Sequence, residues 1–104
     1  MKIIVLGDTH GRSLWKLAVN IEQPDRVIFV GDYFDSFNIP GVEQIHNFKE
    51  IIAYKETAPT EVILLIGNHD HHYFPEIGYT GTSGFQHGIA PNIMQVIDEN
   101  RSHL

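Results

Sequence analysis

Three short apolar runs, each closed by a glycine and a polar cluster, place the strongest constraint on the fold of this chain. They are rich in Ile and Val and occupy Lys2–Leu6, Arg26–Val30 and Glu61–Ile66. Continuous apolar runs of this length, without alternation, are typical of strands buried on both faces of a parallel sheet. We therefore expect three parallel strands.

The stretches between these runs have helical spacing. Ser13–Asn20 carries a candidate N-cap at Ser13, and Val42–Glu56 lies between two prolines. The first stretch predicts an apolar stripe at three- and four-residue intervals, formed by Leu14, Leu17, Ala18 and Ile21. The order β-α-β-α-β predicts an α/β fold, a parallel sheet with flanking helices.

The last third of the chain has a different composition. His71–His87 is rich in Gly, Thr, Tyr and Ser, which predicts a long loop. Ile89–Ser102 predicts one more helix, with a proline in its first turn. No linker divides the sequence, so we predict a single domain over residues 1–104.

Charge and composition limit the classes of function. The 104 residues carry a net charge of −6 and no cysteine. Without a Lys/Arg run, we do not expect binding to a nucleic-acid backbone, and without cysteine there is no disulfide or thiolate metal site. No run approaches the ~18 apolar residues of a membrane span, and the apolar N-terminus is too short for a signal peptide. We expect a cytoplasmic protein without a membrane partner.

Each predicted strand ends in side chains that can bind metals or move protons. In an open parallel sheet, ligands bind beyond the carboxyl ends of the strands, where these clusters should converge. They comprise Asp8 and His10, then Asp32 and Asp35, then Asn68, His69 and Asp70. Taken singly, each cluster also fits an ordinary turn, a helix cap or a solvated loop. Three clusters at three successive strand ends favour a functional site.

The residue types in the first two clusters predict a divalent-metal site. Asp8 and His10 point to the same side of an extended chain, and oxygen and nitrogen ligands together suit Mn, Fe or Zn. Asp32 and Asp35 would repel each other and Asp8 unless cations lie nearby.

The third cluster adds an amide ligand and proton chemistry. The side-chain oxygen of Asn68 can bind a metal. His69 can then act as a proton donor, with Asp70 orienting its ring.

The motifs GDTHG, GDYFD and GNHD resemble, in order, the GDxH, GDxxD and GNH[DE] motifs of the calcineurin-like metallophosphoesterases. The resemblance implies that Asp8 and His10 bind a first metal, that Asp32 bridges two metals and that Asn68 binds the second. The implied activity is hydrolysis of phosphomonoesters or phosphodiesters with two ions of Mn, Fe, Zn or Ni, which polarise the phosphoryl group and activate water.

The resemblance also implies that His69 protonates the leaving group, and we place Asp35 and Asp70 with it in the catalytic group. Protein-phosphatase-like relatives continue the second motif with Arg-Gly, where this chain has Ser36 and Phe37, which argues against a serine/threonine protein phosphatase. Arg12 is a candidate substrate-binding residue, although a place on a helix surface fits it equally.

The resemblance covers only the first half of the family's four-layer α/β/β/α sandwich, so the chain is interpreted as truncated at its C-terminus. The family's second half supplies further histidine ligands, which are missing here. We therefore predict one metal bound moderately and a second bound weakly or not at all. The remaining histidines are expected in loops or on the surface, with the two nearest the crevice, His71 and His72, as candidate substitute ligands. These remaining histidines are His46, His71, His72, His87 and His103.

The missing half would leave one face of the sheet as an apolar patch, so we predict a homodimer that buries this face. One functional hypothesis is a phosphohydrolase acting on a small phosphoester, a nucleotide or a phosphoprotein. The alternative is a weakly active or inactive metal-binding remnant that associates with a partner chain. A generic nucleotide-binding domain is disfavoured, because the phosphate-binding patterns G-x-G-x-x-G and G-K-[ST] are absent.

Overall fold

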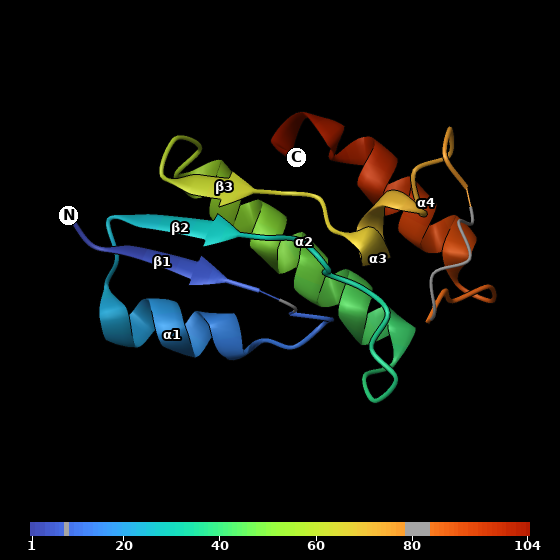
Figure 1. Ribbon diagram of the computed structural model, residues 1–104, viewed down its shortest axis with the longest axis horizontal. Helices are drawn as coiled ribbons and strands as arrows, with labels where there is room; N and C mark the ends of the chain where they lie inside the picture. Colours follow the sequence, from blue (N-terminus) through green and yellow to red (C-terminus); the bar gives the residue numbers. More distant parts are fainter. Residues whose placement is uncertain (8, 79–83) are drawn as a thin grey trace.

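The computed structural model describes residues 1–7, 9–78 and 84–104. Its centre is a parallel sheet in the order β1-β2-β3, made of β1 (Ile3–Leu6), β2 (Arg26–Phe29) and β3 (Val62–Leu64) (Figure 1). Ile28 of β2 is in register with Val5 on one side and Ile63 on the other. The predicted α/β fold with three parallel strands is confirmed.

The third strand is shorter than its apolar run. The hydrogen bond from the N–H of Leu65 to the carbonyl of Phe29, at 2.8 Å, closes the ladder. Because β2 itself ends at Phe29, the chain beyond Leu65 has no strand beside it to pair with. The residues after this point lead into the loop that carries the third polar cluster.

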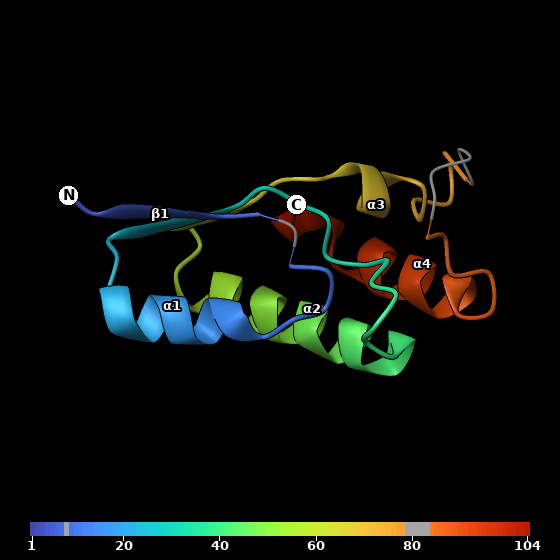
Figure 2. The ribbon, with the colours of Figure 1, turned by 60° about the horizontal axis from the view of Figure 1, so that its bottom comes forward.

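Three helices lie on the same side of the sheet: α1 (Leu14–Glu22), α2 (Gly41–Thr57) and α4 (Ala90–Glu99) (Figure 2). The helix predicted over Ile89–Ser102 is thus split, because a 3-10 turn, η1 (Arg101–His103), follows α4. A one-turn helix, α3 (Asn68–His71), begins inside the third motif, beyond the carboxyl end of β3. No helix in the described part of the chain is long and apolar enough to cross a membrane.

The core fills the space between the sheet and the helices. Phe29 of β2 is fully buried, and its ring lies edge-on to Trp15 of α1, with 5.6 Å between ring centroids. Phe48 of α2 is also fully buried, and its ring centroid lies 5.1 Å from that of Phe34. The first contact packs α1 against the sheet, and the second packs α2 against the loop that follows β2.

Helix α1 is rotated away from the orientation that its predicted stripe implies. Leu14, Leu17 and Ile21 are 69%, 56% and 66% exposed, whereas Trp15 is buried. The indole N–H of Trp15 donates to Oδ1 of Asn47 at 2.9 Å. One large aromatic side chain with a buried hydrogen bond therefore sets the rotation of α1, in place of three smaller aliphatic side chains.

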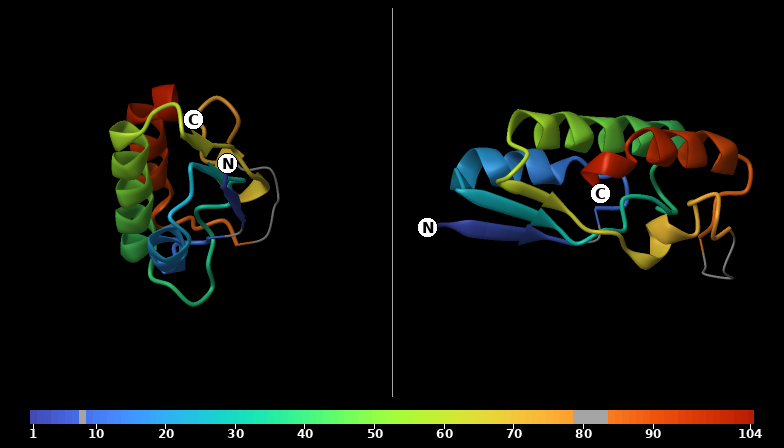
Figure 3. Two further views of the ribbon diagram at one scale, coloured as in Figure 1. Left: turned by 90° about the vertical axis from the view of Figure 1, so that its left-hand side faces the viewer. Right: turned by 90° about the horizontal axis from the view of Figure 1, so that it is seen from above.

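The opposite face of the sheet has no helix over it anywhere in the described ranges (Figure 3). Every second strand residue points to this face, including Val5, which is 61% exposed, and the partly buried Ile28 and Ile63. Apart from Arg26, which is in register with Ile3 on this face, the strands are apolar on both faces, but only one face is covered. The expectation of burial on both faces is therefore wrong for this chain, while the expected uncovered apolar face is present.

Candidate active site

The loops that follow β2 and β3 touch at the carboxyl end of the sheet. Gly31 has a φ of +99°, and a Cβ atom added there would overlap the backbone N of Gly67. A Cβ on Gly67 would overlap Oδ1 of Asp32. Both positions require glycine because the two backbones approach so closely, which gives a physical reason for the glycines that end the second and third apolar runs.

Strained backbone is concentrated at the predicted site residues. His10, Asp32 and Asp35 have φ values of 45°, 59° and 70°, in the left-handed region that side chains other than glycine rarely adopt. Each such residue costs roughly 1–2 kcal/mol. Strain of this kind persists only where surrounding contacts fix the backbone, and it is common at functional sites.

Asp70 ties the second and third loops together. Its Oδ2 accepts the N–H of Asp32 at 2.6 Å and that of Gly67 at 2.9 Å, and its Oδ1 accepts the N–H of Tyr33 at 2.8 Å. Burial raises the pKa of Asp70 to about 7, against the opposite effect of these N–H groups. The carboxylate of Asp70 is thus committed to backbone N–H groups and positions the loops. The expectation that it orients the His69 ring is wrong.

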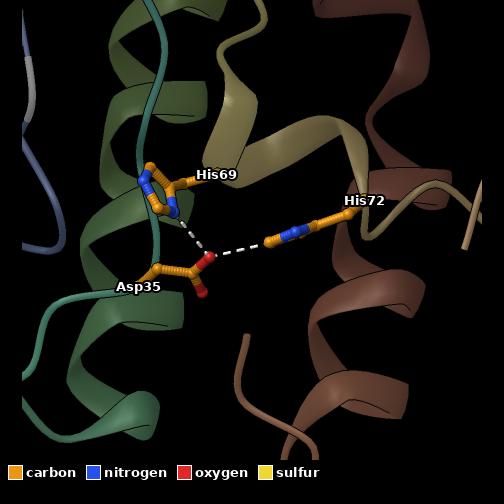
Figure 4. A group of neighbouring side chains, drawn as sticks. All are labelled: Asp35, His69 and His72. Atoms are coloured by element: carbon orange, nitrogen blue, oxygen red, sulfur yellow. Dashed lines mark hydrogen bonds and ion pairs between the residues drawn. The ribbon is translucent and has the colours of Figure 1, made fainter. Parts of the chain in front are cut away.

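Asp35 orients the His69 ring instead. Oδ2 of Asp35 lies 3.0 Å from Nδ1 of His69 (Figure 4). The backbone of Asp35 is itself fixed, because its N–H donates to Oε1 of the buried Gln44 at 2.9 Å. Since the contact uses Nδ1, the second ring nitrogen of His69 is left for a proton transfer.

The buried Asp35 carboxylate also contacts Tyr73 and Gln86, which we did not assign from the sequence, and His72, which we named only as a candidate substitute ligand. Nε2 of His72 lies 2.8 Å from Oδ2, while Tyr73 and Gln86 donate hydrogen bonds to Oδ1. His72 lies in the turn that ends α3, but it is fully buried, so the expectation of a surface position is wrong. Burial lowers the pKa of His72, and the nearby Asp35 carboxylate opposes this shift. The only sequence signal for this cluster is the spacing His69-x-x-His72, about one helical turn.

Asp35, His69 and His72 could together hold a metal ion. Each offers one ligand atom, and these atoms all lie within 4.8 Å of one another. This group differs from the main ligand set that the sequence predicts, although it includes His72, a candidate substitute ligand. In the structure the same three atoms are joined by hydrogen bonds, so an ion at this place would replace those bonds.

The described members of the predicted ligand set also fit a divalent metal. Nδ1 of His10 donates to the carbonyl oxygen of Phe34 at 2.5 Å, which leaves Nε2 with a lone pair. Metal-binding histidines are usually held by such a bond from the other ring nitrogen. The backbone N–H of His10 donates to the carbonyl of Asp32, and that of His69 donates to Oδ1 of Asp32. His10, Asp32 and the exposed Asn68 thus supply an imidazole, a carboxylate and an amide, which are donor types that suit a mixed N/O site. The predicted ligand Asp8 lies outside the described residues.

One pocket is lined by residues from all three strand-end segments. Its lining includes His10, Asp35 and His69, together with the exposed side chain of Arg12. The rings of His10 and His69 lie edge to face, with centroids 5.3 Å apart. A hydrogen-bonded imidazole, a candidate metal-binding imidazole and a guanidinium thus border the same space, which is a chemical environment suited to an anionic oxygen.

Comparisons with known proteins place the chain in a family. Neither a search of curated proteins nor a search of solved structures gives a match. A family model described as calcineurin-like phosphoesterase matches residues 1–100. The matched region contains all three motifs and every residue of the pocket described above. The chain therefore belongs to the calcineurin-like phosphoesterase family.

Proposed function

We propose that this chain is a metal-dependent phosphoesterase that hydrolyses phosphomonoesters or phosphodiesters. The observation that carries the proposal is the contact between His69 and the buried Asp35, in a pocket that His10 and Arg12 also line. Family membership supports a hydrolase, and the Asp35, His69 and His72 group shows that Asp and His side chains at this site lie close enough to hold a metal. The proposed metal-binding residues are His10, Asp32 and Asn68, with Asp8 from the sequence.

Divalent ions, when bound, would polarise the phosphoryl group and lower the pKa of the attacking water. Arg12 binds phosphoryl oxygens in this proposal. The water oxygen forms a new bond to phosphorus while the bond to the leaving-group oxygen breaks. His69 donates its proton to that oxygen, and the attacking water releases one proton to solvent. A phosphomonoester then gives phosphate and an alcohol, and a phosphodiester gives a phosphomonoester and an alcohol. The Asp35 carboxylate holds the ring in place.

Hydrolysis of p-nitrophenyl phosphate and of its bis-ester, with added Mn²⁺, tests this proposal. Asp32→Asn should abolish turnover, and His69→Ala should lower kcat by about 10²–10⁴-fold, the usual contribution of a general acid. His46→Ala is a matched control, since this histidine lies on α2 with 75% of its side chain exposed. Turnover that does not depend on metal, or that neither site substitution changes, would overturn the proposal.

The open sheet face favours a second candidate, a metal-binding chain that acts only with a partner. The specific observation is that Ile3 and Val5 of β1 face solvent, next to the partly buried Ile28 of β2. We propose that a second copy of this chain covers this face, whether the chain is an active enzyme or a metal-binding chain that acts only with a partner. Calorimetric binding of Mn²⁺ without turnover at any protein concentration would favour this candidate over the enzyme. The identity of the metal and a cytoplasmic location stay predictions.

A further inference from the structure

Phe37 borders the candidate active site without contributing to the core. Its side chain is 83% exposed, more than any other large apolar side chain in the described ranges except Met1. It nevertheless lines the same pocket as His10 and His69. A large ring that is left in water next to a polar pocket has no evident role in folding.

The turn that carries Phe37 is held in place on both sides. Oγ of Ser36 accepts the N–H groups of Asn38 and Ile39, each at 3.1 Å. The side-chain amide of the buried Gln44 donates to the carbonyl of Ile39 at 2.6 Å, which anchors the turn to α2. The ring is therefore presented on a pre-shaped turn, so little conformational entropy is lost when a ligand packs on it.

The pocket is lined by two chemically different groups of residues. His10, His69 and Arg12 suit a phosphoryl group and lie beside the Asp35 carboxylate, whereas the segment from Ser36 to Asn38 adds an aromatic ring and an amide. A phosphoester held by the first group would direct its leaving group along the wall that Phe37 forms. Aromatic rings stack on such a surface more favourably than aliphatic groups do.

From this arrangement we infer that Phe37 is a specificity-determining residue that stacks on the leaving group. The preferred substrates are then small phosphoesters whose leaving group carries a planar aromatic ring. The amide of Asn38, in the same wall, can meet a polar edge of that ring. The inference rests on the proposed function, because it assumes that the phosphoryl group lies near His69.

Binding of phenylphosphonate and methylphosphonate to the full chain with Zn²⁺, measured by calorimetry, tests this inference. Neither compound has a P–O–C bond to hydrolyse, so affinity is measured without turnover. Wild type should bind phenylphosphonate about tenfold more tightly, as expected for one stacked ring. Phe37→Ala should reduce this preference to less than about twofold, and Phe37→Trp should keep it. Leu17→Ala, an exposed apolar residue on α1, is the control that should change nothing.

Two results would overturn the inference: equal or absent binding of the two phosphonates by wild type, or a preference that survives in Phe37→Ala. Failure of the proposed function looks different. In that case p-nitrophenyl phosphate is not hydrolysed, while the ratio of the two phosphonate affinities still decides whether Phe37 stacks on the aromatic ring.

Discussion

Phe29 and Asp32 are three residues apart in the chain but lie in opposite physical settings. Phe29, in the body of β2, is fully buried against the aromatic rings of Trp15 and Tyr33. Asp32, just beyond the strand, has a left-handed backbone, and its N–H is bound by the Asp70 carboxylate. The strand bodies are held by apolar contact area, whereas the strand ends are held by a few specific polar atoms.

The difference teaches where this fold tolerates change. Contact area in the core can be redistributed among neighbouring side chains. A buried carboxylate that accepts three N–H groups cannot be replaced in this way, because each unpaired group keeps its desolvation cost. We expect substitutions at the strand ends to depend on atom type, and those in the strand bodies to depend on volume.

Phe29→Ala should have the largest effect, since it leaves a cavity between the sheet and α1. We expect the free energy of unfolding to fall by about 3–5 kcal/mol, as measured by urea denaturation. Phe37→Ala removes the same side chain from an exposed position and should cost less than about 0.5 kcal/mol. Similar costs for both substitutions would show that the strand bodies are not held by burial.

A glycine series should separate strain from close approach at the strand ends. Gly31→Ala should lower the free energy of unfolding by about 2–4 kcal/mol. The added Cβ overlaps the Gly67 backbone, and the φ of residue 31 is positive. Gly78 has a φ of +74° but open space around an added Cβ, so Gly78→Ala tests backbone strain without a close contact. It should lower the free energy of unfolding by about 1–2 kcal/mol. Gly88→Ala has neither feature and should stay within about 0.5 kcal/mol. Thermal unfolding measures all three, and equal costs at Gly31 and Gly78 would contradict the close approach of the loops.

Asp70→Asn should lower the free energy of unfolding by about 1–3 kcal/mol. The amide nitrogen of Asn would face a backbone N–H that donates to a carboxylate oxygen in the wild type. The cost should depend on pH. The pKa of Asp70 is raised to about 7 in the folded chain, so the carboxyl group stabilises the fold most below about pH 4 and loses this contribution as the pH rises through about 7. Urea denaturation of the metal-free chain from about pH 5 to about pH 8 should show that the stability difference between wild type and Asp70→Asn shrinks as the pH rises. Glu43→Gln, on the exposed side of α2, is the control.

A growing difference over the same range would mean that the three N–H groups outweigh burial and favour the ionised carboxylate in the folded chain. The pH comparison therefore decides which of the two opposing effects dominates at this strand end.

The smallest effect on stability is expected at the open face of the strand bodies. Val5→Lys should change the free energy of unfolding by less than about 1 kcal/mol, because the side chain is largely exposed. The same substitution should raise the dissociation constant of the proposed homodimer at least about tenfold, as measured by sedimentation equilibrium, because it places a charge in an apolar contact. Val42→Lys on α2 also adds a charge at an exposed valine and should leave association unchanged. A wild-type chain that stays monomeric at high concentration would refute the homodimer.

Local pattern in the sequence was sufficient for the three strands, the helices between them and the family, because each signal lies within a few residues. Apolar runs closed by glycine predicted the three strands, and the family model matches the region that contains the three motifs. The boundaries of β3 and the division of α4 from η1 were missed, since they depend on which neighbour is available for hydrogen bonding.

Only the tertiary structure decided which partners the site residues have. Asp35 meets His69 across 34 positions and Gln86 across 51, and the burial of His72 depends on the same fold. The sequence placed Asp70 next to His69, but adjacent residues on a helical turn point in different directions. Motifs determined which chemical groups arrive at the end of the sheet, whereas packing between distant segments determined which of these groups touch.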